Sequence, residues 1–263
     1  MASGDLVTWT SHDNTYSRDA IDKMVKRLLL DSADIVYADM YIINETDKIL
    51  RSERHPRIEN LIFRNHIGAC FLYKKSVFDK LNGFRNLFLV EDYDFWLRAS
   101  KYFKFSHIQE ELYYYRIHNK SLTSSISFNS YKGTLYSENI SIVLSDFVDD
   151  LGIENSHPLK SFLINNIRSR SSNFQSLKRQ QNDLFAFIDK LESYEAFTSK
   201  KRLKQQLLKV LIDNLLRDSQ NNGYRLTHIY FFFKNFYKLI GFNEIKSLSR
   251  YFFKCLPKMV SRA

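Results

Sequence analysis

Apolar residues in the first half of the chain follow two spacings in turn, one typical of strands and one typical of helices. The β-rich run 6–10 ends in the polar turn 11–14, and residues 17–30 then place apolar side chains three and four positions apart. The same reading predicts further strands over 34–38, 41–43, 67–73 and 112–117, and further helices over 75–81 and 92–101. Strands that alternate with helices predict an α/β layer architecture.

The second half of the chain carries helical spacing without strand signals. Apolar positions recur at helical intervals over 159–167 and 203–216. We therefore predict two parts, an α/β region over residues 1–124 and a mainly α-helical region over residues 125–263. Seven Gly and three Pro in 263 residues leave little material for a flexible linker.

The positive charge of the chain lies near its C-terminal end. Residues 197–263 hold 14 Lys and Arg against three acids, a surplus of 11, while the remaining residues sum to −1 and the whole chain to +10. Two aromatic clusters, 230–237 and 251–253, lie among these cations. Basic residues beside exposed rings suit an anionic membrane surface, but the same rings would also suit the core of a helical bundle. No recognised nucleic-acid motif accompanies the charge, so nucleic acid is not an expected partner.

Three sequence features bear on the compartment. Cys70 and Cys255 have apolar neighbours, which is typical of buried thiols, and two distant cysteines make no disulfide framework. The first residues lack the basic and apolar segments of a signal peptide. The apolar stretches are too short and too interrupted by charge to span a bilayer. We expect a cytoplasmic protein, either unattached or peripheral at the inner face of the cell membrane.

The polar turn 11–14 is the first candidate for chemistry. It follows a predicted strand and so places Asp13 at the edge of the sheet where ligands bind in open α/β folds. A carboxylate there can hold Mg²⁺ or Mn²⁺ beside the phosphate oxygens of a substrate. Asp and Asn are also ordinary turn residues, so the turn alone leaves a structural role open.

The second candidate is acidic. Glu91, Asp92 and Asp94 place three carboxylates within four residues. Like charges this close raise the pKa of at least one group, which suits a general base. The alternative is a helix start, since acids in the first turn favour the helix dipole.

The third candidate is the strand 112–117, which runs into a polar loop with Arg116, His118 and Lys120. Taken alone, the imidazole has the ordinary role of a histidine that hydrogen-bonds the loop.

Together these motifs resemble, in the same order, those of a family 2 glycosyltransferase with the GT-A fold. The segments that carry the resemblance are TWTSHDN at 8–14, DIVYAD at 34–39, NGF at 82–84, VEDYDFWLR at 90–98 and YYYRIHNKS at 113–121. The resemblance covers about residues 4–123. It implies a partial GT-A-like sheet with flanking helices, followed by the helical region.

The resemblance implies an inverting transfer of sugar from a nucleotide-sugar donor to a glycan or lipid-linked acceptor, in polysaccharide biosynthesis. Asp92 matches the catalytic base that removes the proton from the acceptor hydroxyl. Glu91 and Asp94 would bind the acceptor or serve a structural role. Trp96 fits the core better than a sugar platform.

The resemblance also implies a divalent metal, Mn²⁺ or Mg²⁺, that bridges the donor diphosphate. Asp13 matches its carboxylate ligand, and His118 would complete the site. His12 replaces the first acid of the family's pair and would bind substrate without supplying the same negative charge. Arg116 and Lys120 would contact the diphosphate.

The family's nucleotide-binding half has no counterpart in the sequence. We therefore expect that the chain by itself does not turn over a nucleotide sugar, and that a partner chain could supply the missing strands, because an unpaired sheet edge seeks a partner. The alternative is an inactive, non-catalytic remnant that acts through interaction or by binding a membrane surface.

Overall fold

The computed structural model describes residues 3–118, 131–153 and 156–255. It divides into two compact units. The first contains the residues up to Val143 together with Ser193–Thr198, and the second contains Leu144–Glu192 and the residues from Ser199 onward. The predicted boundary between residues 124 and 125 lies outside the described residues and stays a prediction.

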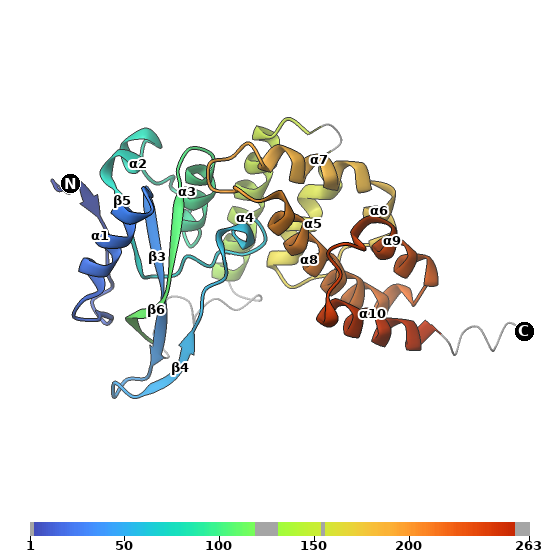
Figure 1. Ribbon diagram of the computed structural model, residues 1–263, viewed down its shortest axis with the longest axis horizontal. Coiled ribbons are helices and arrows are strands. Elements are labelled where there is room, and N and C mark those ends of the chain that lie inside the picture. The colour runs from blue at the N-terminus through green and yellow to red at the C-terminus, as the bar shows by residue number, and fades with distance from the viewer. Residues whose placement is uncertain (1–2, 119–130, 154–155, 256–263) are drawn as a thin grey trace, which may run out of the picture. The chain divides into compact units, whose positions relative to one another are not determined.

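The first unit is built on a mixed sheet in the order β1-β5-β3-β6-β2, with β4 also paired to β3. β3 and β6 are parallel and run side by side in Figure 1, and the other pairs are antiparallel. The strands are β1 (Leu6–Val7), β2 (Thr15–Tyr16), β3 (Ile35–Ile43), β4 (Ile49–Glu53), β5 (Phe71–Lys74) and β6 (Phe105–Arg116). The predicted α/β sheet is confirmed.

β3 is one strand where the sequence predicts two. Its first residues pair with β5 along one edge, and its last four pair with β4 along the same edge. β4 was not predicted because its side chains are mostly exposed, so no apolar alternation marks it. β6 likewise begins seven residues before the predicted start at 112.

Helices cover both faces of this sheet. α1 (Ala20–Leu30) buries Ala20, Met24 and Leu28 in a core cluster with Val36 and Leu72 of the strands. On the opposite side of the pleat, Phe71 and Tyr73 pack against Trp96 of α3 (Glu91–Ser100) at ring-centroid distances of 5.0 and 5.9 Å. Trp96 is fully buried, so it belongs to the core.

The short helix α2 (Lys75–Lys80) ends as the sequence predicts. Asn82 and Gly83 both have positive φ, at 54° and 76°, and the Gly83 amide donates to the Phe78 carbonyl at 3.0 Å. Gly at such a position carries no Cβ penalty, which makes Asn-Gly an efficient helix stop.

The second unit is helical, which confirms the predicted change of character. Its helices are α5 (His157–Ile167), α6 (Phe174–Arg179), α7 (Gln181–Leu191), α8 (Lys200–Asn222), α9 (Leu226–Phe236) and α10 (Phe242–Cys255), while α4 (Tyr131–Asp150) begins in the first unit. Both cysteines are buried and outside any disulfide, as predicted. Among the helices that the structure describes, none has the length and apolarity needed to cross a membrane.

Candidate active site

Arg116, at the end of β6, fixes the turn that bears Asp13. Its backbone amide donates to Asn14 Oδ1 at 2.8 Å, and its Nε donates to the Asp13 carbonyl at 2.9 Å. The rest of the guanidinium reaches the loop after β3, through Nη1 to the Asn44 carbonyl at 2.8 Å and Nη2 to Asp47 Oδ1 at 2.6 Å. One side chain therefore ties three segments together at this edge of the sheet.

The predicted metal ligands meet at this edge. His118 Nε2 lies 2.9 Å from Asp13 Oδ2, and both side chains are about one-fifth exposed. The hydrogen bond from His118 holds the pKa of the Asp13 carboxyl below its usual value. Asp13 is therefore an ionised oxygen donor that still reaches solvent.

Two adjacent ligands of one divalent ion would have the same spacing, provided that His118 Nε2 first loses the proton that it donates to Asp13. Octahedral ligands at about 2.0–2.1 Å from a metal lie roughly 2.9 Å from one another. An oxygen and an imidazole nitrogen form a donor set that suits Mn²⁺. Within the described residues no group of three His, Cys, Asp or Glu side chains gathers around one point, so water and substrate oxygens would complete the coordination.

The other residues predicted near the diphosphate are placed differently. His12 is exposed beside Asp13. The Arg116 guanidinium donates to oxygens of Asp13, Asn44 and Asp47, so it acts here as a positioning residue, and its contact with a diphosphate stays a prediction. Lys120 lies outside the described residues.

Asp92 lies in the first turn of α3 with few protein partners. Asn65 Nδ2 donates to its Oδ2 at 3.1 Å, and the Tyr93 amide donates to its Oδ1 at 2.7 Å. Burial raises the pKa of this carboxyl despite both bonds, and the neighbouring charge of Glu91 raises it further. Tyr136 of α4 lies near Asp92. Burial raises the pKa of the Tyr136 phenol, and the charge of Asp92 raises it further.

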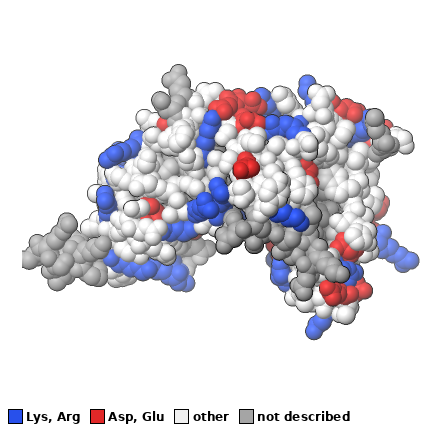
Figure 2. All heavy atoms as spheres, turned by 180° about the vertical axis from the view of Figure 1, so that it is seen from behind, with Lys and Arg blue, Asp and Glu red and all other residues white. Residues whose placement is uncertain are grey.

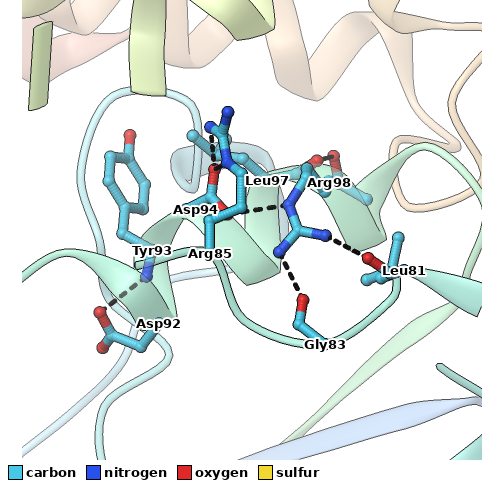
Figure 3. Close-up of polar contacts among 9 residues, drawn as sticks. Leu81, Gly83, Arg85, Asp92, Tyr93, Asp94, Leu97 and Arg98 are labelled. Carbon is cyan, nitrogen blue, oxygen red and sulfur yellow. Dashed lines mark hydrogen bonds and ion pairs between the residues drawn. The ribbon is translucent and has the colours of Figure 1, made fainter. Parts of the chain in front are cut away.

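Asp94 is surrounded by cations, unlike Asp92. It has the structural role that the sequence left open for this residue. Its side chain is buried, Arg85 Nε donates to Oδ1 at 2.8 Å, and Arg98 Nε donates to Oδ2 at 2.8 Å. Arg98 also donates to the Leu81 and Gly83 carbonyls at 2.8 Å each, which ties α3 to the turn after α2. Figure 3 shows this network and shows the Asp92 carboxylate pointing away from it. Glu91, the third acid, is exposed.

Trp9 connects the two groups of acids. It precedes the Asp13 turn, is 41% exposed, and packs edge-to-face on Phe71 at 4.3 Å and on Phe84 at 5.2 Å. Phe84 follows the turn that Arg98 holds, and Phe71 packs on Trp96 of α3. An aromatic chain therefore runs from the Asp13 turn to the helix of Asp92.

Sequence reasoning missed Trp9 and Asn65 as site residues. Trp9 lies inside the motif at 8–14, so a large aromatic residue beside a polar turn was an available signal. Asn65 lies 27 positions before its partner Asp92, and nothing local distinguishes it from other loop residues.

Comparison with known proteins shows one related sequence and several structural likenesses. No protein-family model matches the chain. The O-antigen biosynthesis glycosyltransferase WbnJ of Escherichia coli is 29% identical over 113 residues, which make up 40% of this chain and 44% of that protein. The chain thus matches less than half the length of this curated relative.

Among solved structures, S. aureus TarS 1–349 in complex with UDP-GlcNAc has a TM-score of 0.48 at 14% identity, over 85% of this chain and 70% of that one. S. aureus TarS 1–349 by itself has a TM-score of 0.44 at 12% identity, and the match covers 86% of this chain and 69% of that one. At this level of similarity these likenesses say nothing about what this chain binds.

Proposed function

We propose that residues 4–123 form the metal and acceptor side of an inverting glycosyltransferase of family 2, acting in surface-polysaccharide assembly. The observation that carries the proposal is Asp92, a part-buried carboxylate of raised pKa at the start of a helix that the Asp94 network anchors. Similarity to a glycosyltransferase of O-antigen biosynthesis supports the reaction class.

In the proposed reaction, an acceptor hydroxyl oxygen attacks the anomeric carbon of the donor sugar. The new glycosidic bond forms as the bond from that carbon to the diphosphate breaks, and the nucleoside diphosphate leaves. Asp92 takes the hydroxyl proton, so it must be ionised before the step. Its raised pKa makes it a stronger base than an exposed Asp.

Asp13 and His118 would hold the divalent ion. When bound, Mn²⁺ or Mg²⁺ supplies positive charge for the departing diphosphate. Arg116 orients the ligands by clamping the Asp13 turn to β6. Glu91, which is exposed at the same helix start as Asp92, would contact the acceptor.

The nucleotide-binding part of the proposed enzyme would come from one of two sources. It would lie in sequence outside the residues that resemble the family, or a partner chain would supply it. We expect the chain by itself to release no UDP from UDP-sugars with Mn²⁺. Supplied with a nucleotide-binding half, in cis or in trans, it should transfer sugar. Robust UDP release by the purified chain alone would contradict this division of the site.

Asp92→Asn tests the assigned base. In the transfer-competent form we expect kcat to fall by about 10²–10⁴-fold, because the proton of the acceptor hydroxyl loses its acceptor. Nucleotide binding, measured by titration calorimetry, should stay unchanged. Asp22→Asn, the same charge change at an exposed position of α1, is the matched control and should retain most of the activity. Full transfer by Asp92→Asn would rule out this residue as base.

A non-catalytic interaction protein is the second candidate, and the composition of the polar turn 11–14 favours it. His12 stands where the family has an acid, and only two described side chains meet at the metal position. Absence of transfer in every combination of halves, together with no Mn²⁺ binding that depends on Asp13, would support this candidate.

A further inference from the structure

Exposed apolar side chains concentrate on the last two described helices. Of the 19 large hydrophobic residues exposed in the described part of the chain, eight fall between positions 226 and 253. Solvent-exposed apolar residues are normal when scattered singly, but a cluster of this kind marks an interaction surface.

On α9 the exposed residues share one face. Leu226, Tyr230, Phe233 and Tyr237 recur at helical spacing and are 37%, 66%, 48% and 62% exposed. At about 100° per residue, these four positions fall within roughly 60° of arc. The result is a continuous stripe of three rings and one leucine along the outer face of the helix and its C-cap.

On α10 a second exposed stripe is flanked by cations. Phe242, Ile245, Phe252 and Phe253 lie along one side of the helix at 80%, 48%, 40% and 66% exposure. The adjoining side carries Lys246, Arg250 and Lys254 at i, i+4 and i+8, all exposed. Apolar and cationic residues therefore form neighbouring rows on the same helix.

The fold does not need these exposed rings. α9 already buries Phe231, Phe232 and Phe236 on its inner face, and α10 buries Tyr251. The two helices pack together, with the Tyr251 hydroxyl 2.8 Å from His228 Nδ1. The core interpretation is thus confirmed for the buried rings of the two clusters, while the remaining rings face solvent and membrane attachment stays a prediction.

The charge around the stripes has one sign. Residues 225–255 contain six Lys and Arg and a single acid, Glu244, whose carboxylate accepts from the Gly241 amide at 3.0 Å. None of the six cations is ion-paired within the residues that the structure describes. Figure 2 shows Lys and Arg gathered along the lower edge of the C-terminal part of the chain, with few acids among them.

We propose that the outer face of α9 and α10 docks on an anionic lipid bilayer. Phenyl and phenol rings insert at the headgroup level, and the cations beside them meet lipid phosphates. A second copy of this chain is a poorer occupant, because it would bring the same cations against themselves. A bilayer offers an apolar layer in which the exposed rings can be buried, and negative charge that pairs with the cations.

The test is sedimentation of the full chain with vesicles of 30% phosphatidylglycerol in phosphatidylcholine at low salt. The double variants Phe233→Ser/Phe253→Ser and Lys246→Glu/Arg250→Glu should each lower the partition coefficient by roughly tenfold or more. The matched control Lys201→Glu/Lys209→Glu makes the same charge change at exposed positions of α8 and should lower it far less. Circular dichroism checks that each variant folds.

Several outcomes would overturn the proposal. One is equal binding to pure phosphatidylcholine vesicles, and another is an equal loss in the α8 control, which would indicate net charge alone. A lipid-free dimer that Phe233→Ser/Phe253→Ser dissociates would assign the face to a second copy. Tight binding of a single-stranded RNA that competes with the vesicles would assign it to nucleic acid.

Discussion

Asp92 and Asp94 lie two residues apart on α3, and the protein treats them in opposite ways. Asp94 is buried, with a guanidinium on each carboxylate oxygen. Asp92 accepts one hydrogen bond from the Asn65 side chain and one from a backbone amide, and neither of these donors carries a charge. The difference arises because the two side chains leave the helix in different directions, as Figure 3 shows.

This contrast separates a structural carboxylate from one with capacity left for chemistry. The ion pairs of Asp94 stabilise the helix start and the turn after α2. Burial of Asp92 without a cation costs stability when the group is ionised and raises its pKa. A cluster of acids in sequence can therefore contain one carboxylate held by two ion pairs and one without a charged hydrogen-bond donor.

Asp94→Ala should produce the largest effect. It leaves Arg85 and Arg98 without their shared carboxylate, and we expect unfolding free energy to fall by about 3 kcal/mol, since both guanidiniums retain partial access to solvent. Urea unfolding followed by fluorescence measures this.

Asp92→Asn is the control for Asp94→Ala. Because the folded-state pKa of Asp92 is raised, stability from this group is present below its unfolded pKa and is lost as pH rises through the folded value. At neutral pH the substitution should therefore leave stability equal or slightly higher. Equal destabilisation by both variants would remove the distinction between the two acids.

Asn65→Ala should produce a smaller effect that appears in the pH dependence. The Asn65 hydrogen bond lowers the pKa of Asp92, so its loss raises that pKa. The base must be ionised, and the rise of kcat/KM with pH should shift to higher pH. A pH–rate profile of the transfer-competent form measures this, and an unshifted profile with reduced stability would make Asn65 purely structural.

Glu91→Gln should produce the smallest effect, with the opposite sign. The charge of Glu91 raises the pKa of Asp92, and Glu91 is exposed, so solvent weakens the interaction. Removal of that charge should shift the same limb of the profile to lower pH. A shift in the same direction as Asn65→Ala would exclude the electrostatic explanation.

Local patterns of apolar residues predicted the helices and strands that bury one face. α1 and α3 show apolar side chains at helical spacing, and the Asn82-Gly83 stop lies where it was expected. β4 was not predicted because it buries little, and β3 was predicted as two strands because Asp39 interrupts its apolar run. Asp39 is nevertheless buried, where it accepts from the His55 amide at 2.9 Å and pairs with His107 at 2.7 Å.

The sequence indicated the motifs of the candidate site, but it did not indicate the hydrogen bonds and ion pairs that connect them. Asp13 and His118 are 105 positions apart, and their expected association came from a family resemblance. Arg85 determines which acid of the 91–94 cluster is held in an ion pair. It pairs with Asp94 because of the way α3 packs on the loop after α2. Such contacts are properties of tertiary structure, and no short-range spacing encodes them.

The positions of the two tryptophans, Trp9 at the surface and Trp96 in the core, give the chain a pair of built-in optical reporters. Emission from a solvated indole lies to the red of emission from a buried one and is open to collisional quenchers. A molecule that settles between the Asp13 turn and α3 would shield Trp9 and leave Trp96 unchanged. Loss of the fold would expose both, so occupancy and unfolding have separate spectral signatures.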